Sequence, residues 1–168
     1  IDFSFDHLRL GGSAFAQTRN CIGDDVPTVA NPEYFAEAFD AVQQLVKEGL
    51  VMAGHDVSAG GLITTLLEMC FANTTGGMEI DLNNVVEKDI VKLLFAENPA
   101  LVIQVADKDK CRMQQILDEA GICFVKIGVP CEKRHIAVAK DKRTHLFDIE
   151  HYRDVWFDSS YLMDLKQS

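Results

Sequence analysis

The stretch that decides the fold is Gly54-His55-Asp56-Val57-Ser58-Ala59-Gly60-Gly61-Leu62. The apolar run over residues 50–53 predicts a strand that delivers an acid and a hydroxyl to a helix over residues 60–72. Two adjacent glycines in a first helical turn cost about 1 kcal/mol each relative to alanine. A sequence accepts that cost most readily where another group must approach the backbone closely. The stretch therefore predicts a strand, a tight turn and a helix N-terminus in succession.

Two interpretations of this turn remain open from the residues alone. In the first, the open N–H groups of the helix N-terminus bind a phosphate. Asp56 would repel a bare phosphate, so this interpretation requires a bridging hard cation such as Mg²⁺. In the second, Ser58 caps the helix and the two glycines serve only tight packing.

Charge and hydropathy exclude several classes of function. The net charge of −10 comes from 16 basic and 26 acidic residues. Such a surface is unsuited to coating nucleic acid or docking on an anionic membrane, although a small phosphorylated ligand needs only local donors and a metal. No apolar run is as long as a membrane span, and no signal peptide is recognisable. We therefore expect a cytoplasmic protein without nucleic-acid or membrane partners.

The five cysteines follow no metal-binding or disulfide pattern. Their number is odd, and no two of them have C-x-x-C spacing. This usage is typical of a reducing compartment, where thiols serve as small core residues or surface groups. A structural zinc site is not predicted.

The order of elements predicts an α+β fold, a mixed β-sheet covered by helices. We expect helices over residues 32–48, 60–72, 86–95, 107–119 and 152–165, and strands over 50–53, 78–82, 101–105, 122–127, 135–139 and 144–149. The apolar run 101–105 is typical of a buried central strand, and residues 128–130 of a turn. The apolar face of the first helix is expected to comprise Phe35, Ala38, Phe39, Val42, Leu45 and Val46.

At 168 residues, the chain is long enough for one domain with its own core. We expect an N-terminal arm over residues 1–31, a single α/β-sandwich domain over 32–150 and a C-terminal helix over 151–168. The last helix is expected to turn Val155, Trp156, Leu162 and Met163 toward the protein. Gly11-Gly12-Ser13 could cradle a phosphate or form a flexible crossing. Because the chain begins with Ile1, we expect it to be excised from a longer protein.

Several stretches, in a fixed order, carry a resemblance to a known family. They are residues 10–17, 55–62 with 65–69 and 71–72, 94–97 with 100–105, and Arg153-Asp154-Val155-Trp156 with Ser159-Ser160 and Met163. The chain resembles the C-terminal domain of the aminoimidazole-ribonucleotide-synthetase superfamily, including that domain's fold. Within the superfamily, it is most similar to the large phosphoribosylformylglycinamidine synthases of purine biosynthesis.

The resemblance implies a role within a larger enzyme. That family is an ATP- and glutamine-dependent ligase that converts formylglycinamide ribonucleotide to formylglycinamidine ribonucleotide. It has two tandem halves and a glutaminase domain, so the implied partners are a preceding synthetase-type domain, the glutaminase domain and the nucleotide. The tail and residues 95–105 resemble the second half, whose auxiliary site retains ATP or ADP with Mg²⁺. The isolated domain would then be inactive, with its last helix leading toward the glutaminase.

The resemblance also implies site residues, none of them catalytic. Asp56 would be a metal ligand for Mg²⁺, while Ser58, Gly60 and Gly61 would bind the nucleotide; the other metal ligands would belong to the preceding domain. His55 and Glu97 could line the site. Equally, His55 could be a hydrogen-bonded turn residue, and Glu97 a solvated acid before Asn98-Pro99.

Ala59 departs from the family's second half, where an acid often follows the serine. This departure leaves an alternative function open. The chain could be a non-catalytic structural or interaction module whose nucleotide site has decayed.

Overall fold

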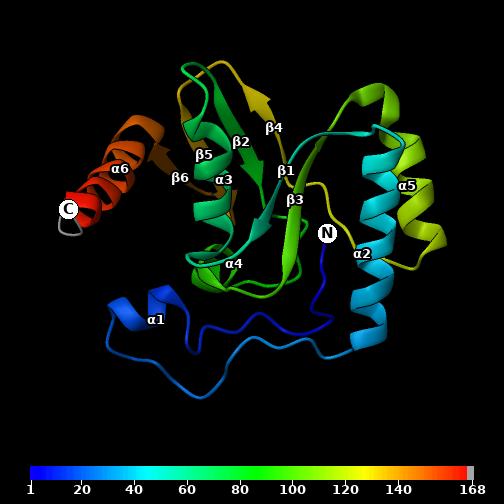
Figure 1. Ribbon diagram of the computed structural model, residues 1–168, viewed down its shortest axis with the longest axis horizontal. Coiled ribbons are helices and arrows are strands. Elements are labelled where there is room, and N and C mark those ends of the chain that lie inside the picture. The colour runs from blue at the N-terminus through cyan, green and yellow to red at the C-terminus, as the bar shows by residue number, and fades with distance from the viewer. Residues whose placement is uncertain (166–168) are drawn as a thin grey trace. The chain divides into compact units, whose positions relative to one another are not determined.

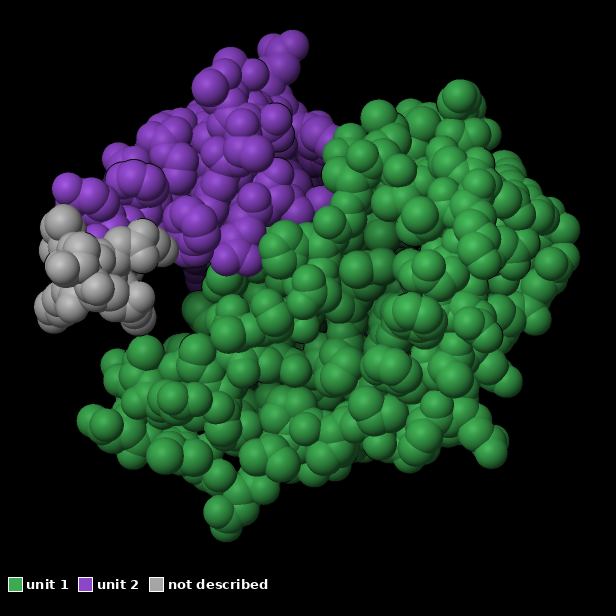
Figure 2. Space-filling view, in the orientation of Figure 1, with its two compact units in different colours: residues 1–65, 87–125 green, residues 66–86, 126–168 purple. Residues whose placement is uncertain are grey.

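The computed structural model describes the backbone of residues 1–165, and their side chains except at 159, 160 and 162–165. The chain divides into two compact units (Figure 2). Unit 1 comprises Ile1–Thr65 and Glu87–Val125, and unit 2 comprises Leu66–Val86 and Lys126–Ser168. No helix in the described part of the chain is both long and apolar enough to cross a membrane. The elements (Figure 1) are α1 (Ala14–Thr18), α2 (Pro32–Lys47), β1 (Val51–Val57), α3 (Gly61–Phe71), β2 (Gly77–Asp81), α4 (Ile90–Phe95), β3 (Ala100–Val105), η1 (Asp107–Asp109), α5 (Lys110–Glu119), β4 (Gly128–Cys131), β5 (His135–Lys140), β6 (Arg143–Asp148) and α6 (Ile149–Leu165).

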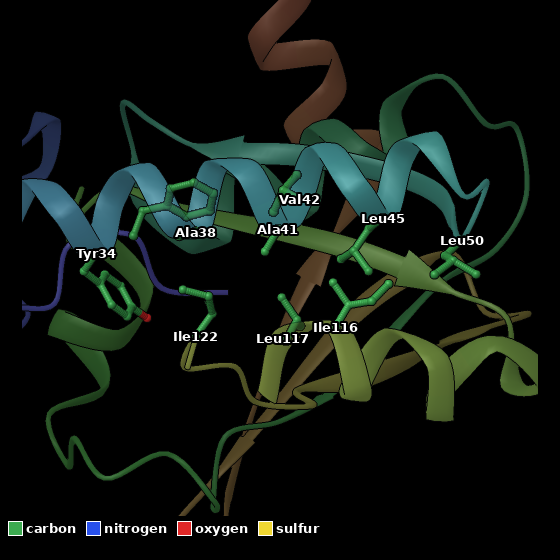
Figure 3. Packing of buried hydrophobic residues seen from close by; sticks show 10 residues of the cluster. Tyr34, Ala38, Ala41, Val42, Leu45, Leu50, Ile116, Leu117 and Ile122 are labelled. Atoms are coloured by element: carbon green, nitrogen blue, oxygen red, sulfur yellow. The ribbon is translucent and has the colours of Figure 1, made fainter. Parts of the chain in front are cut away.

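In unit 1, the core lies where α2 and α5 face each other (Figure 3). The α2 helix begins as predicted, because the Asn31 side chain accepts hydrogen bonds from the N–H groups of Glu33 and Tyr34 and Pro32 occupies the first turn. Leu45 and Leu117 are fully buried between the two helices. The strands β1 and β3 of this unit pair antiparallel with each other.

The buried face of α2 differs from the predicted one. Its buried residues are Tyr34, Ala38, Ala41, Val42 and Leu45. In contrast, Phe35, Phe39 and Val46 are 37%, 51% and 54% exposed. The prediction was wrong at these three positions because the stripe that contacts α5 is narrower than the whole set of apolar residues, and it is rotated toward Tyr34 and Ala41.

Unit 2 contains a four-stranded sheet in the order β4-β2-β5-β6. The β2 and β5 strands are parallel, whereas the other neighbours are antiparallel. The predicted hairpin of β5 and β6 is confirmed, and it turns at Asp141 and Lys142, whose φ values are 47° and 64°. One face of the sheet buries Ile80, Ile136 and Val138. The expected α+β fold with a mixed sheet is thus confirmed, while the proposed domain boundaries stay a prediction.

One predicted strand, one predicted turn and the predicted place of one further strand in the sheet were wrong. Residues 122–127 form no strand, and β4 occupies residues 128–131, where a turn was expected. Gly128 allows β4 to approach β2, because a Cβ atom there would lie 2.3 Å from the Glu79 carbonyl oxygen. The β3 strand is not central, since it pairs only with β1 and with a single bridge from Asp2 among the described residues. All six residues of β3 are only half-buried, and Leu101 and Ile103 pack against the core between α2 and α5.

Two helix assignments also change. The helix expected over residues 86–95 begins only at Ile90, because the Asp89 side chain caps it by accepting from the Val91 N–H; Val86 is 94% exposed. The last helix begins three residues early, at Ile149. Val155 and Trp156 are half-exposed rather than turned inward, although the Trp156 ring contacts Phe71. The side chains of Leu162 and Met163 lie outside the described residues.

Candidate functional site

The predicted turn begins later than expected, because β1 continues through His55 and Asp56 to Val57. His55 lies opposite Val102, and Asp56 opposite Leu101, in the antiparallel pair with β3. The longer strand results from this pairing, which extends over the full length of β3. Asp56 is therefore fixed by a strand ladder, and only residues 58–60 separate that strand from α3.

The backbone of Asp56 is held while its carboxylate faces solvent. The Thr65 hydroxyl donates to the Asp56 carbonyl oxygen at 3.1 Å, and His55 Nδ1 lies 2.8 Å from the same oxygen. The Asp56 side chain is 75% exposed, with His55 Nδ1 3.6 Å from its Oδ1 atom. His55 is therefore hydrogen-bonded, and it approaches the carboxylate of Asp56.

The described residues do not form a complete metal site by themselves. Among the described residues, no group of three or more His, Cys, Asp or Glu side chains could hold a metal ion. A hard cation prefers several oxygen ligands, and here the exposed carboxylate of Asp56 could supply one of them. Further ligands would have to come from another polypeptide segment, from water or from a ligand.

Both glycines of the turn have conformations and surroundings that favour glycine. Their φ values are +89° at Gly60 and +72° at Gly61, in the left-handed region. A Cβ atom at Gly61 would lie 2.7 Å from the Leu94 carbonyl oxygen and from Phe95 backbone atoms. At Gly60, it would collide with the side chain of Thr64. Close packing therefore explains the two glycines without any ligand, as in the packing part of the second interpretation, while the cap by the Ser58 side chain stays a prediction.

The side-chain acceptor at the N-terminus of α3 is Glu97. Its Oε1 atom accepts a hydrogen bond from the Gly60 N–H at 2.7 Å and a second from the Ala14 N–H at 2.8 Å. Glu97 is thus not a solvated acid of the turn before Pro99. Ser58 contacts the same helix start through its backbone, because its carbonyl oxygen accepts from the Gly61 N–H at 3.0 Å. The N–H groups of both glycines are therefore already paired.

The N-terminal segment is fixed by internal hydrogen bonds. The N–H groups of Gly11 and Gly12 donate to the carbonyl oxygens of Asp25 and Ile22, each at 2.8 Å. The Ser13 side chain caps α1 by accepting from the Ala16 N–H. The phosphate-cradle interpretation of residues 11–13 is therefore unsupported, because its glycine donors are occupied.

A separate hollow of about 570 Å³ opens on the sheet of unit 2. Polar residues that line it include Glu79, Asp81, Lys126 and Lys133. None of the predicted site residues lines this hollow. Its open form and opposed charges give no specific ligand chemistry.

The sequence-level signals found the turn but missed the contacts that hold it. Ala14 and Glu97 are 83 residues apart, and Gly60 and Glu97 are 37 apart. The spacing of apolar residues along the sequence carries no information about hydrogen bonds between such distant residues. The order of the matching stretches was the only available signal that these segments belong together.

Comparison with known proteins identifies the family. Residues 4–141 match the family described as AIR synthase related protein, C-terminal domain. The chain belongs to this family. It is 34% identical over 169 residues to a probable phosphoribosylformylglycinamidine synthase, chloroplastic/mitochondrial, of Arabidopsis thaliana, and 34% identical over 164 residues to the phosphoribosylformylglycinamidine synthase of Homo sapiens. These alignments cover 99% and 95% of this chain but only 12% of each relative.

Solved structures support the same fold for this member of the family. T. maritima PurL complexed with ATP has a TM-score of 0.65 at 16% identity, covering 73% of this chain and 22% of that one. The structure of PurLQS from Thermotoga maritima also has a TM-score of 0.65, at 15% identity, covering 84% of this chain and 24% of that one. At such identities the likeness concerns the fold alone. The predicted resemblance to phosphoribosylformylglycinamidine synthases is confirmed.

Proposed function

We propose that this chain is the AIR-synthase-type C-terminal domain of a phosphoribosylformylglycinamidine synthase. That enzyme would be an ATP- and glutamine-dependent ligase acting on formylglycinamide ribonucleotide, with a preceding synthetase-type domain and a glutaminase domain as partners in the cytoplasm. The observation that carries the proposal is the match of almost the whole chain to relatives that bear this name. Because the chain spans about an eighth of their length, catalysis would belong to the whole protein.

Within that enzyme, the domain would form one wall of a nucleotide–Mg²⁺ site. The exposed carboxylate of Asp56 fits one ligand of Mg²⁺, which would neutralise the charge between this acid and a phosphate. Ser58 would contact the nucleotide, and His55 would line the site. Gly60 and Gly61 would contribute to nucleotide binding through the shape of their turn, because their N–H groups are already paired. Solved relatives complexed with ATP and with ADP support the choice of ligand.

The first test is an immunoblot of the source lysate with antibody raised against this chain. A band far heavier than 18.7 kDa supports a domain of a larger synthase, whereas a band at 18.7 kDa contradicts it.

The second test is calorimetry of Mg·ADP binding to the protein that the blot identifies. The Asp56→Ala variant should lose Mg²⁺-dependent binding, while Asp24→Ala, an exposed-acid control outside the proposed site, should retain it. Unchanged binding in Asp56→Ala would overturn the metal role. The isolated chain should show no synthase turnover, and detectable turnover would contradict the assignment of catalysis to the whole protein.

A second candidate function is favoured by the Glu97 contact. The Glu97 carboxylate already accepts a hydrogen bond from the Gly60 N–H. A phosphate would therefore find one free donor fewer, and less uncompensated positive charge, at the N-terminus of α3. The domain could therefore be a structural and interaction module with a decayed site. In that case, Asp56→Ala would change nothing in the calorimetry, because no nucleotide would bind at this turn.

A further inference from the structure

Residues 94–98 connect several distant segments of unit 1. The Asn98 side chain is 3% exposed; its Oδ1 accepts from the Arg9 N–H at 3.1 Å, and its Nδ2 donates to the His7 carbonyl oxygen at 3.0 Å. The Phe95 ring stacks on Phe15 with 4.8 Å between centroids and 24° between planes. These contacts fasten the N-terminal segment to the chain that precedes β3.

Glu97 adds the contact that joins this segment to the glycine turn. A single oxygen, Oε1, accepts from the N–H of Ala14, where α1 begins, and from the N–H of Gly60, directly before α3. Charge-assisted hydrogen bonds to a carboxylate are stronger than neutral ones, and α3 places its partial positive charge at this end. Removal of this acceptor would release two donors from segments that have no sequence proximity.

The glycine turn also has little room to move on its other side. The Gly61 backbone packs so closely on Leu94 and Phe95 that no Cβ atom would fit between them. Glu97 lies two residues after Phe95, in the same segment before β3, and its carboxylate accepts a hydrogen bond from the Gly60 N–H. The turn is therefore held through steric contact at one glycine and through hydrogen bonding at the next.

We propose that Glu97 is a positioning residue that couples the N-terminal segment 13–18 to the turn 58–61. The two segments open together, and the turn has its final shape before any ligand arrives. Because a carboxylate occupies the Gly60 N–H, this donor is closed to phosphate, and a nucleotide must approach through Asp56 and its cation. This last consequence rests on the proposed function, whereas the coupling itself does not.

Hydrogen exchange at individual amides of the full chain tests the coupling. In Glu97→Ala, we expect the exchange of the Ala14 and Gly60 amides to accelerate together by about tenfold or more, because both lose their acceptor. Amides in the α2–α5 core should keep their rates. Glu97→Gln retains an oxygen acceptor and should restore most of the protection.

The control variant is Glu119→Ala, because Glu119 accepts a side-chain bond from Gln115 within the same helix, four residues away. It should leave the Ala14 and Gly60 amides unchanged. Acceleration at only one of these two amides in Glu97→Ala would overturn the coupling, as would an equal acceleration throughout the chain. No rescue by Glu97→Gln would overturn the role of the oxygen acceptor.

The coupling and the proposed function fail in different experiments. Joint acceleration of the Ala14 and Gly60 amides in Glu97→Ala, with no Mg·ADP binding to the wild type, would support the positioning role and reject the nucleotide site. Retained Mg²⁺-dependent binding with unchanged exchange in Glu97→Ala would do the reverse. Glu97→Ala frees the Gly60 N–H. If it bound Mg·ADP more tightly than the wild type, the closure of this donor to phosphate would be supported; an unchanged affinity would contradict that closure.

Discussion

Gly49 at the end of α2 and Gly61 at the start of α3 have the same backbone conformation for different reasons. Their φ values are +70° and +72°. A Cβ atom at Gly49 would meet nothing within 4 Å, whereas one at Gly61 would lie 2.7 Å from the backbone of Leu94 and Phe95. Gly49 ends a helix, with the Leu50 N–H bonded to the Leu45 carbonyl oxygen, as in a Schellman motif. Glycine is therefore required at position 49 for the helix-ending turn and at position 61 for close packing against neighbouring backbone as well.

The largest effect is expected for Gly61→Ala. The variant combines a left-handed backbone with a collision against backbone atoms that cannot rotate away, so we expect a loss of about 3 kcal/mol or more in the free energy of unfolding. Gly49→Ala is the matched control and should lose only about 1 kcal/mol, because its site is open. Urea unfolding followed by circular dichroism measures both. Equal losses would show that α4 can move away from Gly61, and the comparison would then fail.

The sequence predicted the two ends of α2 better than it predicted the site. Asn31, Pro32 and Gly49 are local signals, and the helix follows them within a residue or two. The hairpin around residues 141–142 was predicted for the same reason.

The errors occurred where pairing between distant segments decides the structure. Gly128 is typical of a turn by itself, and only its pairing with Ile80 of β2 makes it a strand residue. The position of Glu97 follows from the same cause, since its partners are Ala14 and Gly60. Local patterns contain no information about such partners.

A smaller effect is expected at the opposite end of α2, where Tyr34 fixes the helix by hydrogen bonding. Its hydroxyl donates to the Asp2 carbonyl oxygen at 3.2 Å and accepts from the Cys123 N–H at 2.9 Å. Burial raises the pKa of this phenol to about 12. Tyr34→Phe should cost about 1–2 kcal/mol, because the donor of Cys123 loses its acceptor while the ring still packs.

The control for Tyr34→Phe is Tyr152→Phe, whose residue is 39% exposed and should lose less than about 0.5 kcal/mol. Both are measured by urea unfolding at pH 7. If the two variants lost equal stability, packing of the Tyr34 ring and not its hydroxyl would anchor this end of α2.

The smallest effect is expected from the ion pair at the open end of α2, where packing gives Gly49 no support. Arg112 Nε and Nη2 donate to the two carboxylate oxygens of Glu48 at 2.8 and 2.7 Å. These hydrogen bonds, and a further one from the Gln44 side chain, lower the pKa of Glu48 from its usual value to about 2. A lowered folded-state pKa contributes stability that is fully present above the unfolded-state value and is lost as the pH falls through the folded-state value. The advantage of the wild type over Glu48→Gln should therefore be constant above about pH 5 and disappear between pH 4.5 and about 2.

Thermal unfolding of both proteins at a series of pH values measures this difference, with Asp118→Asn as an exposed control on α5. Because the pair is solvated, the shift in midpoint should be small and should decrease with added salt. A difference that persisted unchanged at pH 2 would show that Glu48 acts through its place at the helix cap and not through its carboxylate charge. The end of α2 would then be held by its backbone motif alone, and the contrast with Gly61, where neighbouring backbone atoms fix the turn, would be sharper still.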